Sequence, residues 1–155
     1  NAADLRIDRD KISVMGHSAG GHLTAMMMAT DWSAFDPAMP LDTVHSGIPI
    51  SGIFELEPLV HTSINHGPQM DVDEARRESP LFMEPVTDAP QLVVAGGEET
   101  PEFKRQSDAY CERYRTAARS IERYDVPGEN HFGELERLAE SDSEFFQRSI
   151  ALVGG

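Results

Sequence analysis

Residues 12–25, ISVMGHSAGGHLTA, pass from a strand pattern to a helix pattern with no room for a loop between the two. Residues 11–15 predict a short buried strand, and a helix is expected over 18–30. Ser18 must then stand on a tight corner, and Gly16 and Gly20, two positions to either side, leave the space that such a corner needs. The segment predicts a parallel sheet in which the hydroxyl of Ser18 projects above a strand end.

The rest of the chain repeats the order strand then helix. The further strands are expected at 43–51, 91–95 and 120–126. After the strand at 91–95, Thr100 followed by Pro101 predicts a helix start. Strands that alternate with helices are typical of a parallel sheet covered on both faces, so we predict an α/β fold with about four strands.

Two segments complete this expected domain, which comprises residues 1–155. The stretch 55–90 is rich in Pro and charge and holds only short helical pieces, and it predicts a cap or pocket wall inserted between strands. The last helix is expected to bury a face formed by Phe146, Ile150 and Val153.

Composition excludes several classes of protein. The formal charge of -14 on 155 residues argues against binding to nucleic acid or to an anionic membrane, because both require basic patches. No apolar run approaches the roughly 20 residues of a membrane span. The single cysteine, Cys111, is expected to pack in the core, and one cysteine suits a reducing cytoplasm.

A serine on such a corner predicts nucleophilic catalysis, which needs a base and an acid that orients the base. The carboxyl ends of the last two strands supply both, because open parallel sheets gather their sites at that edge. His131 follows the last strand as the candidate base, and Glu98, Glu99 and Glu102 follow the strand before it as candidate acids.

Two further inferences concern the surroundings of Ser18. The N–H of Ala19, at the start of the helix that follows Ser18, is expected to donate to the developing oxyanion. His17 and His22 are five residues apart, which is not the helical spacing of zinc ligands, so neither a metal nor another cofactor is expected.

Several stretches resemble the C-terminal half of α/β-hydrolases of the kynurenine formamidase (arylformamidase) group and of related bacterial esterases and lipases. These stretches are GHSAGGHL, PISGIFELEPLVHTSIN, ESPLF, VVAGGEETPEFKRQS and ENHFGELERLAE. The resemblance implies a cytoplasmic serine hydrolase that cleaves N-formylkynurenine or small aryl esters and formamides. It implies Ser18 as nucleophile, His131 as base and Glu99 as acid, with Glu98 and Glu102 as rivals because the group often has Asp at this position.

The resemblance also implies a substrate pocket walled by residues 55–90. The candidate pocket residues are His17, Phe54, Leu59 and Phe82. A general carboxylesterase or lipase-like hydrolase is the alternative within the same class.

One part of the group's pattern does not occur here, namely the HGG loop that supplies the other oxyanion donors. The four leading strands of the full hydrolase are also absent from this sequence. A second alternative is therefore a catalytically incomplete fragment. We expect these residues alone to have low activity, and to self-associate or to require an N-terminal half.

Overall fold

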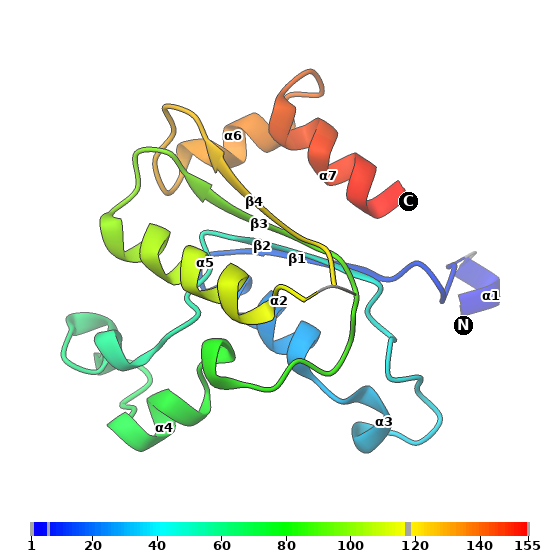
Figure 1. The fold of residues 1–155 in the computed structure, drawn as a ribbon, viewed down its shortest axis with the longest axis horizontal. Coiled ribbons are helices and arrows are strands. Elements are labelled where there is room, and N and C mark those ends of the chain that lie inside the picture. The colour runs from blue at the N-terminus through cyan, green and yellow to red at the C-terminus, as the bar shows by residue number, and fades with distance from the viewer. Residues whose placement is uncertain (1, 6, 117–118, 155) are drawn as a thin grey trace.

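The computed structural model describes residues 2–5, 7–116 and 119–154 (Figure 1). Its centre is a four-stranded sheet in the order β1-β2-β3-β4, in which each strand runs parallel to its neighbour. The strands are β1 (Ser13–His17), β2 (Ser46–Ile50), β3 (Gln91–Gly96) and β4 (Ile121–Val126). The predicted α/β fold with about four parallel strands is confirmed.

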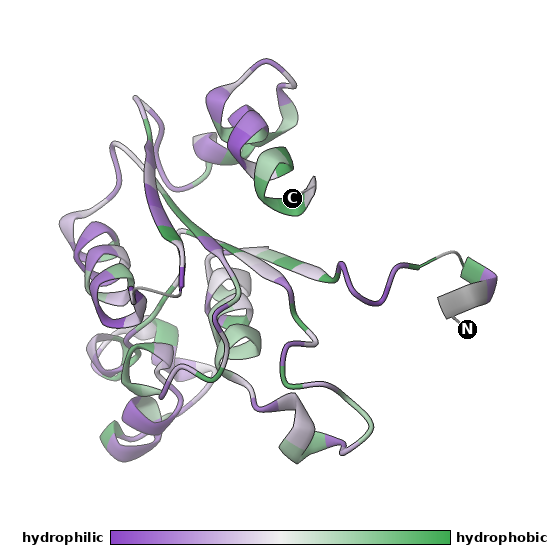
Figure 2. Ribbon diagram, turned by 45° about the vertical axis from the view of Figure 1, so that its right-hand side comes forward, coloured by the Kyte–Doolittle hydropathy of each residue, from purple (hydrophilic) through white to green (hydrophobic). Residues whose placement is uncertain are grey.

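Helices cover both faces of the sheet, as Figure 1 shows. One face carries α2 (Ala19–Ala29) and α5 (Pro101–Tyr114), and the other carries α6 (Gly133–Ala139) and α7 (Glu144–Gly154). Because side chains alternate along a strand, Val93 packs in the core beside α5, whereas Leu92 and Val94 pack in the core beside α7. Figure 2 shows hydrophobic stretches along the central strands and hydrophilic turns on the outer side of the helices.

The helix after β3 begins where the sequence predicts, with Thr100 as its N-cap residue and Pro101 in its first turn. Cys111 lies buried in the core on the inner side of this helix. Burial raises the pKa of its thiol to about 11, so the cysteine packs as a small apolar group.

The last helix differs from its prediction by one residue in register. Phe145 and Ser149 form the buried face of α7, whereas Ile150 and Val153 are 54% and 40% exposed. Phe145 and Phe146 are adjacent in the sequence, so a helix that buries either one has apolar residues on its inner face. Packing of Phe145 against Tyr124 of β4 favours the observed register.

The segment between β2 and β3 contains only short elements, as expected for 55–90. They are η1 (Glu57–Leu59), η2 (Ser63–His66), α4 (Val72–Arg77) and η3 (Pro80–Phe82). Two further short helices, α1 (Ala2–Leu5) and α3 (Trp32–Phe35), lie outside this segment, and α1 projects away from the sheet (Figures 1 and 2). No helix within the described ranges is long and apolar enough to cross a membrane.

Strand β1 stands at one edge of the sheet and, within the described residues, pairs with β2 alone. The C=O of Ile12 and the N–H of Ser18 are bonded to the β2 side. Because backbone groups alternate in direction along a strand, those of Ser13, Met15 and His17 face the open side. Such a row of free donors and acceptors is a template for strand pairing.

We propose that this open edge is an association surface and expect residues 1–155 alone to self-associate through it. Met15 is 45% exposed on β1, and Met15→Lys places a charge on the edge, which disfavours strand pairing. Sedimentation velocity over a concentration series should show oligomers that this variant shifts toward monomer. Phe35→Lys, which adds the same charge at an exposed site on α3, should leave the distribution unchanged. A monodisperse monomer at every concentration would contradict the proposal.

Candidate active site

Ser18 occupies the corner between β1 and α2 in a strained backbone conformation. Its φ is 57° and its ψ is -115°, which few residues other than glycine adopt. The backbone N–H of Ser18 donates to the C=O of Ile50 at 2.9 Å, and its C=O accepts from the N–H of His22 at 3.0 Å. These two bonds hold the corner between the sheet and the helix. Strain of this kind is typically retained at functional positions.

The glycines around Ser18 have different roles. A Cβ on Gly16 would collide with the backbone carbonyl of Gly20, so the corner requires glycine at Gly16. A Cβ on Gly20 would meet no atom within 4 Å, so the expectation that both flanking glycines make room is wrong for Gly20. Gly21 is required instead, because its Cβ would lie 2.7 Å from the Cα of Gly52 and would push α2 away from the sheet.

His131 and Glu99 form a short hydrogen bond at the carboxyl ends of β4 and β3. The Nδ1 of His131 lies 2.5 Å from Oε1 of Glu99, whose side chain is 1% exposed. The other carboxylate oxygen, Oε2, accepts from the N–H of Gly96 at 3.0 Å and from Ser51 Oγ at 2.6 Å. With Nδ1 donating to this carboxylate, Nε2 of His131 is left as a proton acceptor.

Of the three candidate acids, the structure brings Glu99 to His131 and turns the other two elsewhere. Glu98 is exposed, and its backbone N–H bonds to the C=O of Glu129. Glu102 is exposed in the first turn of α5 and pairs with Arg105, which lowers the pKa of the Glu102 carboxyl.

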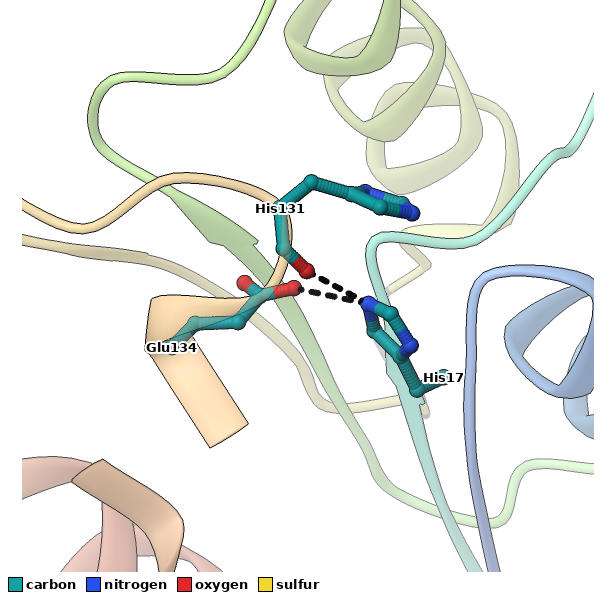
Figure 3. A group of neighbouring side chains, drawn as sticks. All are labelled: His17, His131 and Glu134. Atoms are coloured by element: carbon teal, nitrogen blue, oxygen red, sulfur yellow. Dashed lines mark hydrogen bonds and ion pairs between the residues drawn. The ribbon is translucent and has the colours of Figure 1, made fainter. Parts of the chain in front are cut away.

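His17 packs directly against the ring of His131, with their centroids 4.5 Å apart (Figure 3). Its Nε2 lies 2.6 Å from the backbone C=O of His131, and because a carbonyl only accepts, this nitrogen carries the proton. Burial lowers the pKa of His17, so the ring is neutral at neutral pH. His17, which immediately precedes Ser18 in the chain, thus positions the loop that carries His131.

Two residues close to Glu99 and His17 were not among the site residues predicted from the sequence. Ser51, directly after β2, is fully buried with a φ of 43°, and its hydroxyl lies between Glu99 and Glu134. Glu134, in the first turn of α6, is fully buried. The signal that could have found Ser51 is its place at the carboxyl end of a parallel strand, where Glu99 and His131 also lie.

His17, His131 and Glu134 carry atom types that can bind metals, and these atoms lie within 4.8 Å of one another (Figure 3). One potential ligand atom of each residue already makes a hydrogen bond: Nε2 of His17, Nδ1 of His131 and Oε1 of Glu134. Nε2 of His17, which lies 3.5 Å from Oε1 of Glu134, donates its proton to a carbonyl and has no free lone pair for a metal. The geometry supports a hydrogen-bonded cluster at this position.

A small apolar cavity of about 140 Å³ lies next to Phe103, which in turn packs near His131. Phe103 joins the two, because its ring lines the cavity and lies 4.7 Å from the ring of His131. Of the predicted pocket residues, Leu59 lines this cavity. Phe54 is instead a fully buried core residue stacked on Tyr110, and Phe82 is 42% exposed under Arg76.

Known proteins similar to this chain agree with the geometry. A family model described as BD-FAE matches residues 1–47. The kynurenine formamidase of Salmo salar is 30% identical over 145 residues, which cover 90% of this chain and 48% of the relative. The kynurenine formamidase of Danio rerio is 31% identical over 144 residues, with the same two coverages.

Among solved structures, a protein of Silicibacter sp. TM1040 provisionally named a thioesterase is 33% identical, with a TM-score of 0.78. The match covers 99% of this chain and 54% of that one. The chain thus spans about half the length of the curated relatives it matches.

A parallel sheet with a strained serine between a strand and a helix is the architecture of an α/β-hydrolase, and these comparisons place the chain in that class. Within the class, the chain is similar to kynurenine formamidases and to the Silicibacter protein, each of which it matches over about half of that protein's length. The resemblance read from the sequence motifs is confirmed.

Proposed function

We propose that this chain carries the catalytic residues of a serine hydrolase that cleaves a small acyl ester or a formamide such as N-formylkynurenine. Ser18 is the nucleophile, His131 the base and Glu99 the acid. The observation that carries the proposal is the 2.5 Å bond between Glu99 and His131 at the sheet edge where Ser18 is held in a strained corner. The names of the relatives support formamide or ester cleavage.

The geometry supports the following reaction. Ser18 Oγ attacks the carbonyl carbon and its proton passes to Nε2 of His131, while Glu99 balances the imidazolium charge. His131 returns that proton to the leaving nitrogen or oxygen, which leaves the acyl or formyl group on Ser18. Water then attacks this ester, gives its proton to His131, and releases the acid with Ser18 restored.

We infer two further contacts for this scheme. Within the described residues, no hydrogen bond joins Ser18 Oγ to His131, and such catalytic bonds often tighten only with substrate bound. Ala19 is the first residue of α2. Its N–H supplies one oxyanion donor, because the first N–H groups of a helix have no acceptor within the helix.

Substrate preference is the direct test of this function. If the small cavity next to Phe103 receives the acyl group, kcat/KM should be at least about tenfold higher for formyl or acetyl groups on an aromatic leaving group than for an octanoyl group. N-formylkynurenine, p-nitrophenyl acetate and p-nitrophenyl octanoate should be compared side by side on the purified protein.

The Ser18→Ala variant is the control, and it should remove all three activities. Equal or better cleavage of the octanoyl ester would instead favour a general carboxylesterase, the alternative within the same class of hydrolases. Because low activity is expected of residues 1–155 alone, lack of turnover on all three substrates would contradict the proposed function when the chain is assayed together with an N-terminal half.

A further inference from the structure

The hydroxyl of Ser51 lies between two carboxyl groups in the interior of the protein. Its Oγ is 2.6 Å from Oε2 of Glu99 and 2.5 Å from Oε1 of Glu134. Ser51 and Glu134 are both fully buried, and the Glu99 side chain is 1% exposed. Because water is excluded, each of the two short contacts of Ser51 needs a proton supplied by Ser51 or by one of the carboxyl groups.

Counting protons shows that one of these carboxyl groups is neutral. A serine hydroxyl has one proton and can donate to only one carboxylate at a time. If both were ionised, the second short contact would join a lone pair to a negative charge without a proton between them. That arrangement would leave an uncompensated charge in the interior, which is strongly unfavourable.

The surroundings of the two groups identify the neutral one. Three donors face Glu99: the ring of His131, the N–H of Gly96 and the hydroxyl of Ser51. Glu134 has Ser51 Oγ at Oε1, with Nε2 of the neutral His17 more distant at 3.5 Å from that oxygen, and its buried Oε2 has no hydrogen-bond partner among the described residues. Donors stabilise the ionised form, so the negative charge belongs on Glu99 and the proton on Glu134.

We propose that Glu134 is a neutral, protonated positioning residue that holds Glu99 through Ser51. The proton of Glu134 is donated to Ser51 Oγ, the hydroxyl of Ser51 is donated to Glu99, and Glu99 accepts the Nδ1 proton of His131. The role rests on the proposed function, because it acts through the acid of that triad. The strained φ of Ser51 is the cost of aiming its hydroxyl along this line.

The charges around Glu134 agree with a neutral group. The pKa of Glu134 is raised to about 7; burial is the largest cause, the charges of Glu99 and Asp125 act in the same direction, and Ser51 and Arg123 oppose them. The guanidinium of Arg123 is engaged with Asp108 and Asp125, and His17 is neutral. Glu134 therefore keeps its proton below about pH 7 and loses it as the pH rises through that value.

The test uses two substitutions that separate a neutral hydrogen-bond donor from a charge. Glu134→Gln has the shape of the protonated carboxyl and can donate to Ser51, so kcat should fall by less than about threefold. Glu134→Leu cannot donate, and kcat should fall roughly 10- to 100-fold because Glu99 and His131 lose their alignment. Glu136→Gln, an exposed charge on the same helix, is the matched control.

Infrared spectroscopy reads the proton of Glu134 without catalysis. We expect a carboxylic-acid C=O band in the unsubstituted protein at about pH 6, absent from Glu134→Gln, present in Glu136→Gln, and lost as the pH rises through about 7. The alkaline fall in kcat/KM that accompanies this loss should disappear in Glu134→Gln.

Three results would overturn the proposal: a band that survives Glu134→Gln, a loss of activity in Glu134→Gln as large as in Glu134→Leu, or full activity in Glu134→Leu. If Glu134→Leu does not fold, the infrared band and the comparison of Glu134→Gln with the unsubstituted protein still decide the matter. An inactive protein that shows the band would contradict the proposed function and leave the proton on Glu134 supported.

Discussion

Ser18→Ala should lower kcat/KM by roughly 10⁴- to 10⁶-fold on any substrate the protein cleaves, because no other group can form the acyl bond. A fluorophosphonate probe should label the unsubstituted protein at Ser18, where Oγ displaces fluoride from phosphorus, and should not label the variant. The measurement combines steady-state kinetics with mass spectrometry of the labelled peptide.

Ser33→Ala is the control for this prediction, because Ser33 is an exposed serine on α3, away from the corner. It should retain both labelling and turnover. Labelling that persists in Ser18→Ala would place the nucleophile elsewhere. The strained corner between β1 and α2 would then need another explanation.

Glu99→Gln is the second substitution with a large expected effect, and we expect kcat to fall by roughly 10³- to 10⁴-fold. A glutamine amide can donate to Nδ1 of His131, which would favour the tautomer that carries its proton on Nε2. That tautomer cannot accept the proton of Ser18. The amide also removes the negative charge that stabilises the imidazolium.

Glu98→Gln and Glu102→Gln are the matched controls, since both remove a charge close to Glu99 in the chain without touching His131. Each should change kcat by less than about threefold. A large loss in Glu98→Gln with little effect in Glu99→Gln would mean that the loop after β3 adopts a different register in the working enzyme. Circular dichroism should verify that every variant remains folded.

Much of the site could be predicted because its parts lie at strand ends. A strand followed at once by a helix placed Ser18 on its corner, and the order of strands placed the glutamates and His131 at the same sheet edge. Parallel strands end side by side, so residues far apart in the chain meet there without any knowledge of side-chain packing. The fold class followed from the same alternation.

The acid and the buried network depended on contacts that no local pattern contains. Adjacent residues in a loop point in different directions, and the bond from the N–H of Glu98 to Glu129 turns that side chain to solvent while Glu99 turns inward. Ser51 and Glu134 are 83 residues apart in the chain. They meet only because the fold brings the end of β2 next to the first turn of α6.

The sequence by itself determined the alternation of strands and helices, the corner at Ser18 and the loop position of His131, because glycine spacing and apolar periodicity act over a few residues. Tertiary structure alone decided that Phe145 rather than Phe146 faces the core and that Ser51 bridges two carboxyl groups, and it brought Glu99, the acid implied by the resemblance, to His131. In the case of the glutamates and of the phenylalanines, the alternatives are neighbouring residues of the same type, which local sequence patterns do not distinguish. Burial separates them, because the cost of an unpaired charge or an exposed ring depends on what the rest of the chain packs around it.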